Sequence, residues 1–202
     1  DFLKPDQQPG LKHELELVMD ESIGAARLKT TAPLNIMFGK YWYRSGTNLS
    51  MKAALKDVVD SILPLTDTYA WSIQWLDIAC NDGTLLSYVP EEYTKFGVDP
   101  CEYSIYWQAV KRGNIYKEFF SKDIFEPGQK FNVITTIAMF YDIENPDAFI
   151  KDVYEVMDDE GLWVLQLSYT PLMIKQLAFD NILSEHVYYH TLGSIKKLME
   201  RN

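Results

Sequence analysis

The chain has 202 residues, of which 47% are hydrophobic and 14% aromatic, so it can bury the core of one globular domain. Its formal net charge is -10, and its 19 basic residues are spread among 29 acidic ones. This balance argues against nucleic acid or an anionic membrane surface as a partner. No apolar run approaches the roughly 20 residues of a transmembrane helix, and the most apolar stretch, 131–141, contains Asn and Thr.

The two cysteines, Cys80 and Cys101, are too few for a four-cysteine zinc site or a disulfide framework. They indicate a reducing compartment, and we expect a cytoplasmic protein. The chain begins with Asp rather than Met and carries no signal-like segment, so we expect that its N-terminus is trimmed or incomplete.

Residues 1–48 have weak periodicity and several Pro and Gly residues, which predicts a loop-rich lead-in. From Asn48 onward, apolar residues follow the three- and four-residue spacing of an amphipathic helix. Asn48 or Ser50 is its expected N-cap, and Pro64 its expected stop. We therefore divide the chain into a lead-in, 1–48, and a main domain, 49–202.

Strand-like and helix-like segments alternate after this helix. Strands are predicted at 71–79, 95–98, 115–120, 131–138 and 162–168. Helices are predicted at 83–89 and 102–112, and a third begins at Pro146, with Asn145 as its N-cap and Gly161 as its stop. Because parallel strands need crossover connections, the alternation predicts an α/β fold with a parallel sheet covered on both faces.

The stretch LDIACNDGTLL, 76–86, joins the first of these strands to the next predicted helix through the turn 79–83. In an open parallel sheet, ligands bind beyond the carboxyl ends of the strands. Small residues let the backbone approach a ligand, and the following helix offers unpaired N–H groups to a carboxylate or phosphate. The stretch FGVDP places Asp99 at the end of the second strand, 22 positions after Asp77 (99 minus 77), where an acidic residue binds ribose hydroxyls.

The chemistry of the turn distinguishes between cofactors. A dinucleotide site requires G-x-G-x-x-G, whereas this turn has Ala79 and Asn81 at the first two glycine positions and Leu85 near the third. Asp77 and Asp82 would repel a pyrophosphate but suit a ligand that carries an ammonium and a sulfonium group. The turn therefore favours S-adenosylmethionine (SAM) over NAD, and the alternative is an ordinary strand end without a ligand.

Three further residues lie close to the predicted cofactor. Asp123, in the loop after the third strand, either contacts the adenine amino group or is a solvated loop acid. Cys80 and Cys101 are expected to be small packing residues rather than nucleophiles. The predicted cofactor-binding residues are Asp77, Ala79, Asn81, Asp82, Gly83, Asp99, Pro100, Asp123 and Ala138.

LDIACNDGTLL resembles the first cofactor motif of the sugar C-methyltransferases, enzymes that act on nucleotide-linked 4-keto sugars in deoxysugar biosynthesis. LELVMDESIGAARL followed by FGKYWYRSGTNLSM resembles that family's link from an N-terminal zinc module, and FDNILSEHVYYHTLGSIKKLM resembles its catalytic segment. The resemblance implies a Rossmann-like class I methyltransferase fold, SAM as cofactor and a nucleotide sugar as substrate.

The chain departs from this family in two places. Residues 20–24 read DESIG where the family has a Cys-x-x-Cys-Gly zinc half-site, so no metal site is expected. The family also continues through further strands and a C-terminal domain beyond the point that corresponds to Asn202. We therefore expect either a fragment or a reduced relative.

Methylation at carbon needs a base that removes a proton next to a ketone. His186 falls on the catalytic histidine of the family, Glu185 beside it could orient the sugar or tune the imidazole, and Tyr43 with Tyr41 falls on a tyrosine segment at the sugar site. The alternatives are a packing role for each of these side chains. Arg44 and Lys40 are weaker candidates for the sugar diphosphate, and His186 with His190, four residues apart, is a weak metal signal.

Two other functions remain open from the sequence. The missing zinc thiols, and Leu183 and Ser184 where the family usually has Tyr and His, are compatible with a small-molecule O- or N-methyltransferase. A non-catalytic SAM-binding protein is the third possibility.

Overall fold

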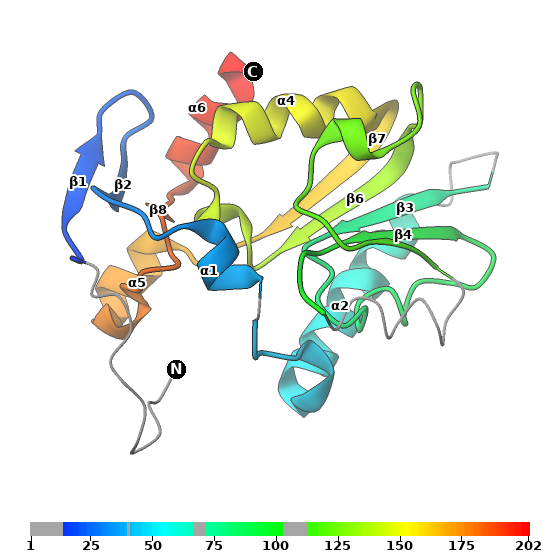
Figure 1. The fold of residues 1–202 in the computed structure, drawn as a ribbon, viewed down its shortest axis with the longest axis horizontal. Helices are drawn as coiled ribbons and strands as arrows, with labels where there is room; N and C mark the ends of the chain where they lie inside the picture. The colour runs from blue at the N-terminus through cyan, green and yellow to red at the C-terminus, as the bar shows by residue number, and fades with distance from the viewer. Residues whose placement is uncertain (1–13, 40, 67–71, 103–112) are drawn as a thin grey trace.

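The computed structural model describes residues 14–39, 41–66, 72–102 and 113–202. Its main sheet has five strands in the order β5-β4-β3-β6-β7, and every neighbouring pair is parallel (Figure 1). The bounds are Gln74–Ile78 for β3, Thr94–Val98 for β4, Asn114–Tyr116 for β5, Phe131–Ile137 for β6 and Met157–Gln166 for β7. The predicted α/β fold with a parallel sheet is confirmed.

Helices cover both faces of this sheet, with α2 on one side and α4 and α6 on the other (Figure 1). The α-helices are α1 Leu34–Phe38, α2 Leu49–Thr66, α4 Pro146–Val156, α5 Thr170–Gln176 and α6 Leu192–Arg201. Trp75 packs with Val59 in the core under α2, whereas Leu76 packs with Val153 in the core under α4. Neighbouring strand residues enter opposite cores because side chains alternate across a sheet.

Short 3-10 helices connect several of these elements. They are η1 Ser45–Thr47, η2 Lys122–Ile124, η3 Phe140–Asp142 and η4 Phe179–Asn181. Of these, η3 follows the carboxyl end of β6, an edge at which parallel sheets commonly bind ligands.

The predicted N-cap of α2 is confirmed, but its predicted stop is wrong. The Asn48 side chain accepts hydrogen bonds from the backbone N–H groups of Ser50 (2.9 Å) and Met51 (3.4 Å). The helix passes through Pro64 and ends at Thr66. Pro64 lies in the last turn, where the buried Thr66 hydroxyl donates to the Leu63 carbonyl at 2.7 Å and holds the chain helical.

The start of α4 is confirmed, and the predicted stop at Gly161 is wrong. Asn145 accepts from the backbone N–H of Ala148 at 3.1 Å, and the helix ends at Val156. Gly161 lies within β7, where the pairing with β6 is irregular. A Cβ atom there would come within 2.8 Å of the Asp158 carbonyl oxygen. Gly161 is therefore required by a bulge in the strand.

The predicted helix at 83–89 is not present; this segment forms successive turns. The Ser87 N–H donates to the Gly83 carbonyl, four residues earlier, at 3.1 Å, as in an α-helix. The Tyr88 N–H instead donates to the Leu85 carbonyl, only three residues earlier, at 2.9 Å, and no helix continues to Pro90. Seven residues before a proline provide too few hydrogen bonds to establish a helix. Most of the helix predicted at 102–112 lies outside the described residues.

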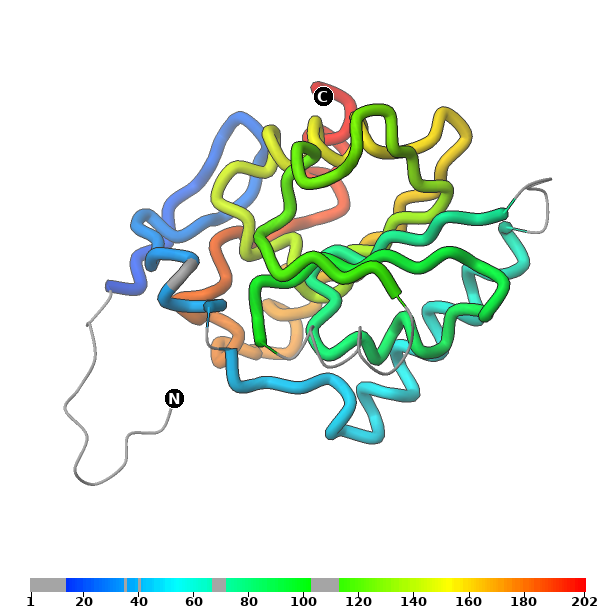
Figure 2. The backbone as a smooth tube through the Cα atoms, turned by 45° about the vertical axis from the view of Figure 1, so that its right-hand side comes forward, coloured from blue at the N-terminus to red at the C-terminus, as the bar shows by residue number. Residues whose placement is uncertain are grey.

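The lead-in contains regular structure that the sequence did not predict. β1 (Leu17–Asp20) and β2 (Ala25–Leu28) form an antiparallel hairpin, and β8 (Tyr188–Tyr189) pairs with β2 in a second sheet. Figure 2 shows this hairpin beside the C-terminal part of the chain. The hairpin 17–28 thus pairs with the segment that was predicted to be catalytic.

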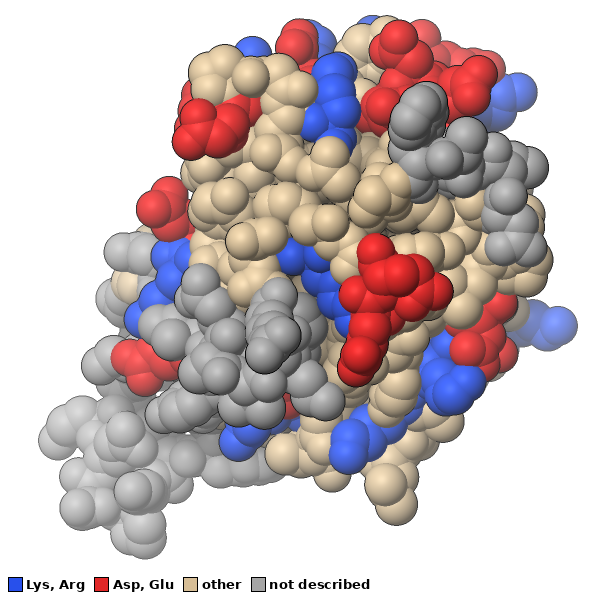
Figure 3. Space-filling view, turned by 90° about the vertical axis from the view of Figure 1, so that its right-hand side faces the viewer, with Lys and Arg blue, Asp and Glu red and all other residues tan. Residues whose placement is uncertain are grey.

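Within the described ranges, no helix has both the length and the apolar character needed to cross a membrane. On the described part of the face in Figure 3, Lys and Arg side chains lie scattered among acidic and uncharged ones and form no continuous patch.

Candidate functional site

A cleft of about 720 Å³ opens at the carboxyl ends of β3, β4 and β6. The residues that end these strands or directly follow them line its floor: Ile78, Ala79, Val98, Asp99, Pro100, Ile137 and Ala138. Its position is the edge at which an open parallel sheet binds ligands.

The turn after β3 has the backbone conformation of a glycine-rich loop without the glycines. Ala79 and Asn81 have φ angles of 60° and 50°, in the left-handed region that glycine usually occupies. The N–H groups of Ala79 and Cys80 both bond the Val98 carbonyl, at 2.8 and 3.2 Å, which fixes the turn to the end of β4. The backbone of this turn therefore stays close to the floor of the cleft.

Asp99 joins the turn to the end of β4. Its two carboxylate oxygens accept hydrogen bonds from the backbone N–H groups of Asn81 and Cys101, each at 2.8 Å. Each carboxylate oxygen can accept more than one hydrogen bond, and ribose hydroxyls are donors. Asp99 thus combines a structural role in the turn with a position on the cleft wall.

Asp77 lies at the bottom of the cleft and is 3% exposed. Burial raises the pKa of this carboxyl group to about 7, the hydrogen bond from the Thr135 hydroxyl opposes the rise, and the nearby charge of Asp99 adds to it. That hydrogen bond is 2.6 Å long. A cationic ligand in the cleft would favour the ionised form of Asp77.

Segment 43–46 is hydrogen-bonded to the turn after β3. The Asn81 side chain donates to the Tyr43 carbonyl and accepts from the Ser45 N–H, both at 3.0 Å. Asp82 accepts from the Gly46 N–H at 3.0 Å, and a Cβ atom on Gly46 would lie only 2.8 Å from that carboxylate. Segment 43–46 is therefore held at the turn by contacts between its backbone and the side chains of Asn81 and Asp82.

The structure separates the predicted cofactor residues into two groups. Asp77, Ala79, Asn81, Asp99, Pro100 and Ala138 line the cleft. Asp82 instead bonds Thr84 and Gly46 and lies 3.8 Å from the Arg44 guanidinium. Gly83 lies in the turn and has a φ angle of 74°, in the left-handed region. Asp123 is exposed on η2. Neither Gly83 nor Asp123 is among the residues that line the cleft.

Replacing Asn81 by alanine should destabilise the protein by about 1–3 kcal/mol, because two polar contacts are lost and alanine is strained at this φ angle. Asn81→Gly removes the same contacts without the strain and is the matched control. Urea unfolding of both variants would separate the two contributions. An Asn81→Ala protein as stable as the parent would show that segment 43–46 is not held through Asn81.

Both cysteines are buried, as expected for packing residues. Cys80 lies over Gly97, where a Cβ atom would be only 2.8 Å from its sulfur. Burial raises the pKa of the Cys80 thiol well above its ordinary value, which disfavours the reactive thiolate.

Tyrosines and a carboxyl group form the other end of the cleft, which we call the acceptor end: Tyr41, Tyr43, Tyr141 and Asp142. Burial raises the pKa of Tyr41 and of Tyr141, and the charges of Asp142 and Glu185 add to the effect, so both phenols are neutral hydrogen-bond donors. Burial, followed by the charge of Glu185, raises the pKa of Asp142 to about 9.

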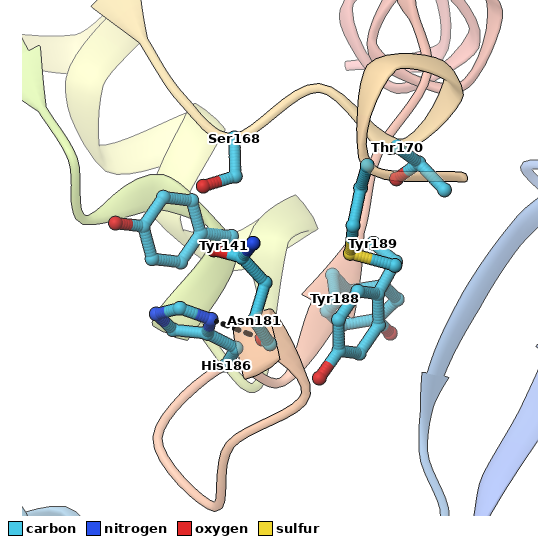
Figure 4. A pocket seen from close by; sticks show the side chains of 8 residues that line it. Tyr141, Ser168, Thr170, Asn181, His186, Tyr188 and Tyr189 are labelled. Carbon is cyan, nitrogen blue, oxygen red and sulfur yellow. Dashed lines mark hydrogen bonds between the residues drawn. The ribbon is translucent and has the colours of Figure 1, made fainter. Parts of the chain in front are cut away.

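His186 lies beside this end but does not line the cleft. It lines a small neighbouring cavity with Ser168, Asn181 and Tyr141 (Figure 4). Its Nδ1 lies 2.8 Å from the Asn181 carbonyl, which can only accept, so Nδ1 carries the proton and Nε2 has the free lone pair. The Tyr141 ring lines both cavities and packs edge to face on the imidazole, with 4.6 Å between centroids.

His190 is fully buried and has a packing role. It stacks on Tyr188 with 5.4 Å between centroids, and its Nδ1 lies 3.2 Å from the Ser194 hydroxyl. Burial lowers its pKa to about 4, so it is neutral near pH 7. Among the described residues, no group of three His, Cys, Asp or Glu side chains could hold a metal ion.

Tyr141 and Asp142 line the cleft but were not among the residues predicted from the sequence. Both lie in η3, directly after β6, at the same edge as the turn after β3. The signal was present in the sequence: a strand that ends at position 138 places polar residues 141 and 142 at the carboxyl edge.

Among the described residues, six carboxyl groups and no Lys or Arg line the cleft; the carboxyl groups are those of Asp77, Asp99, Glu118, Asp142, Glu144 and Asp152. A cationic cofactor is attracted to such a cleft, and a pyrophosphate is repelled. Together with the left-handed turn and the Asp99 carboxylate, this lining fits SAM.

Comparisons with known proteins support this cofactor. Residues 48–202 match the profile of the family described as "Methyltransferase domain". No curated protein sequence matches the chain.

Three solved structures resemble the fold. The plantazolicin methyltransferase BpumL, in complex with a monoazolic desmethylPZN analog and SAH, has 17% identity over 74% of this chain and 62% of that chain, with a TM-score of 0.58. The plantazolicin methyltransferase BamL, with a triazolic analog and SAH, has 12% identity over 76% and 62%, and a TM-score of 0.62. A SAM dependent methyltransferase from Archaeoglobus fulgidus has 19% identity over 74% and 67%, and a TM-score of 0.59.

These identities establish a shared fold, that of the Rossmann-like class I methyltransferases, and nothing about the substrate. In these two comparisons, the chain spans 62% of the length of the plantazolicin methyltransferase.

Proposed function

Because the chain belongs to the methyltransferase domain family and its cofactor is SAM, we propose that it methylates a small organic acceptor at the Tyr141–Asp142 end of the cleft. The acceptor that we propose is a keto sugar, methylated at carbon. The observation that carries this proposal is that the cleft joins the cofactor turn to Tyr41 and Tyr43, in a stretch that resembles the sugar C-methyltransferases.

SAM, when bound, supplies an electrophilic methyl group. Asp99 is positioned to accept from ribose hydroxyls, and Asp77 contributes negative charge beneath the turn. Ala79 and Ala138 are small residues at the strand ends, and both have positive φ angles that turn the backbone along the floor of the cleft. These residues bind and orient the cofactor without taking part in proton transfer.

Carbon methylation requires loss of a proton next to the ketone, and His186 is our candidate for the base. Its Nε2 has the free lone pair, but the Tyr141 ring stands between the imidazole and the cleft, so the ring must turn aside for contact. Burial and the charge of Asp82 raise the pKa of Tyr43, which makes that phenol a poor base. We therefore assign Tyr43 to the wall of the cleft, where it contacts the acceptor without removing a proton.

The acidic lining supports a second candidate function, N-methylation of a small amine. An ammonium group is attracted by the cleft carboxylates, whereas a sugar diphosphate is repelled by them. For the first proposal, this means that only the uncharged keto sugar ring enters the described cleft.

Solvent exchange distinguishes the two functions. The protein is incubated in D₂O with SAH and a nucleotide-linked 4-keto-6-deoxy sugar, and deuterium is followed by NMR at the carbon beside the ketone. We expect exchange that depends on the protein, because only carbon methylation requires that proton to leave. Methylation of an amine, with no exchange on the keto sugar, would contradict the proposal.

His186→Asn tests the base in the same assay. Exchange should fall by roughly 10²- to 10⁴-fold, the usual contribution of general base catalysis, while SAM affinity stays unchanged. Near-normal exchange in this variant would show that another group takes the proton.

A further inference from the structure

Asp142 is a partly exposed residue with one carboxyl oxygen that is unpaired among the described residues. It ends η3, immediately beyond the strand whose carboxyl end lies beside the cofactor turn, and it lines the cleft. Its Oδ1 is inaccessible to solvent and has no hydrogen-bond partner among the described residues. Because Oδ1 is inaccessible, the other carboxyl oxygen, Oδ2, is the atom through which Asp142 can meet an acceptor in the cleft.

The groups around Asp142 are neutral or acidic. Tyr141 precedes it in η3, Tyr41 reaches it from the segment after α1, and Glu185 and Tyr189 reach it from the segment that contains β8. None of these groups is a cation that would hold Asp142 ionised. Together with burial, the charge of Glu185 keeps the Asp142 carboxyl group protonated at pH 7.

We propose that Asp142 is a catalytic residue whose carboxyl group hydrogen-bonds the carbonyl oxygen of the acceptor, with Glu185 as a positioning residue. This inference rests on the proposed carbon methylation. It assigns to Asp142 the role of hydrogen-bond donor, while the base is a separate group.

The proton balance explains why a neutral acid is useful here. When the base removes the proton from the carbon beside the ketone, the electron pair of that C–H bond moves into the carbonyl group, and negative charge develops on its oxygen. A carboxyl O–H aimed at that oxygen stabilises the charge as it forms, and it does so strongly because the site is buried. An ionised Asp142 would instead repel the same oxygen.

Three variants test the inference through the rate of solvent exchange on the keto sugar with SAH bound. Asp142→Ala removes the donor, and the rate should fall about 10²- to 10³-fold, as for an oxyanion-stabilising donor. Asp142→Asn keeps an N–H donor of similar size and should retain most of the rate. Glu185→Gln removes the charge beside Asp142 and is compared with the parent through its pH profile.

The pH profile distinguishes this role from a merely structural one. In the parent protein, exchange should fall as the pH rises through about 9, where Asp142 loses its proton. Glu185→Gln removes the charge that raises the pKa of Asp142, so this alkaline limb should move to lower pH. Asp142→Asn cannot ionise, so the limb should be absent.

A titration without acceptor is a separate readout. The carboxyl carbon of Asp142, assigned by its absence from the Asp142→Asn spectrum of ¹³C-labelled protein, should show the protonated form at pH 7. An ionised Asp142 at pH 7, or full exchange in Asp142→Ala, would overturn the inference and leave the proposed function intact. No exchange in a parent protein with a protonated Asp142 would overturn the proposed function, and the inference with it.

Discussion

Replacing Asp99 by alanine is expected to weaken SAM binding by about 10- to 100-fold, or about 1.5–3 kcal/mol, because a charged hydrogen-bond acceptor is lost. The change also leaves the N–H groups of Asn81 and Cys101 without their acceptor, so the turn itself loses support. Isothermal titration calorimetry with SAM measures the effect, and circular dichroism checks that the variant is folded.

Two control variants sharpen this result. Asp99→Asn keeps one oxygen that can accept and should bind SAM with intermediate affinity. Asp123→Ala changes an exposed residue that is not among those lining the cleft, and it should bind SAM as the parent does. Unchanged affinity in a folded Asp99→Ala protein would remove the assignment of the FGVDP stretch to the cofactor.

SAM affinity is expected to rise with pH through about 7, the pKa of Asp77 in the ligand-free protein. The ionised carboxylate attracts the cationic cofactor, so below this pH each unit should cost up to about tenfold in affinity, equivalent to about 1.4 kcal/mol. Calorimetry between pH 5.5 and about 8 would record the change.

Asp77→Asn is the matched control for this pH dependence. The variant should bind SAM more weakly near pH 8 and should lack the step in affinity that is centred near 7. Its stability gives an independent check. The pKa of Asp77 is raised in the folded state, so the parent loses stability relative to Asp77→Asn as the pH rises from about 4 to about 7. A parent affinity that does not change with pH would contradict this role for Asp77.

The main sheet and the cofactor turn could be predicted from sequence because their signals are local. Apolar runs bounded by turn residues mark the five strands, and the order of strand, small-residue turn and acidic strand end marks the cofactor edge. Ala79 and Asn81 occupy the positions where glycine was expected, and both adopt the left-handed conformation. Local chemistry and strand order were therefore sufficient to predict most of the residues that line this part of the cleft.

The acceptor end depends on contacts between distant segments, which a single sequence does not display. The resemblance pointed to His186, yet the fold places the Tyr141 ring between this histidine and the cleft. Asp142 and Glu185 are 43 positions apart (185 minus 142), and only the folded chain brings their charges together. The hairpin β1–β2 was missed for a similar reason, because its short strands are completed by β8 near the other end of the chain.

A crystal structure of the protein with SAH and a keto sugar nucleotide would test the whole assignment of the cleft most directly. We expect the ribose on Asp99, the methionine portion against the turn at 79–81, and the sulfur facing the acceptor end, with the sugar carbonyl oxygen hydrogen-bonded to Asp142. A sugar carbonyl bound away from Asp142, or a sulfur directed away from Tyr141 and Asp142, would contradict the proposed arrangement of cofactor and acceptor.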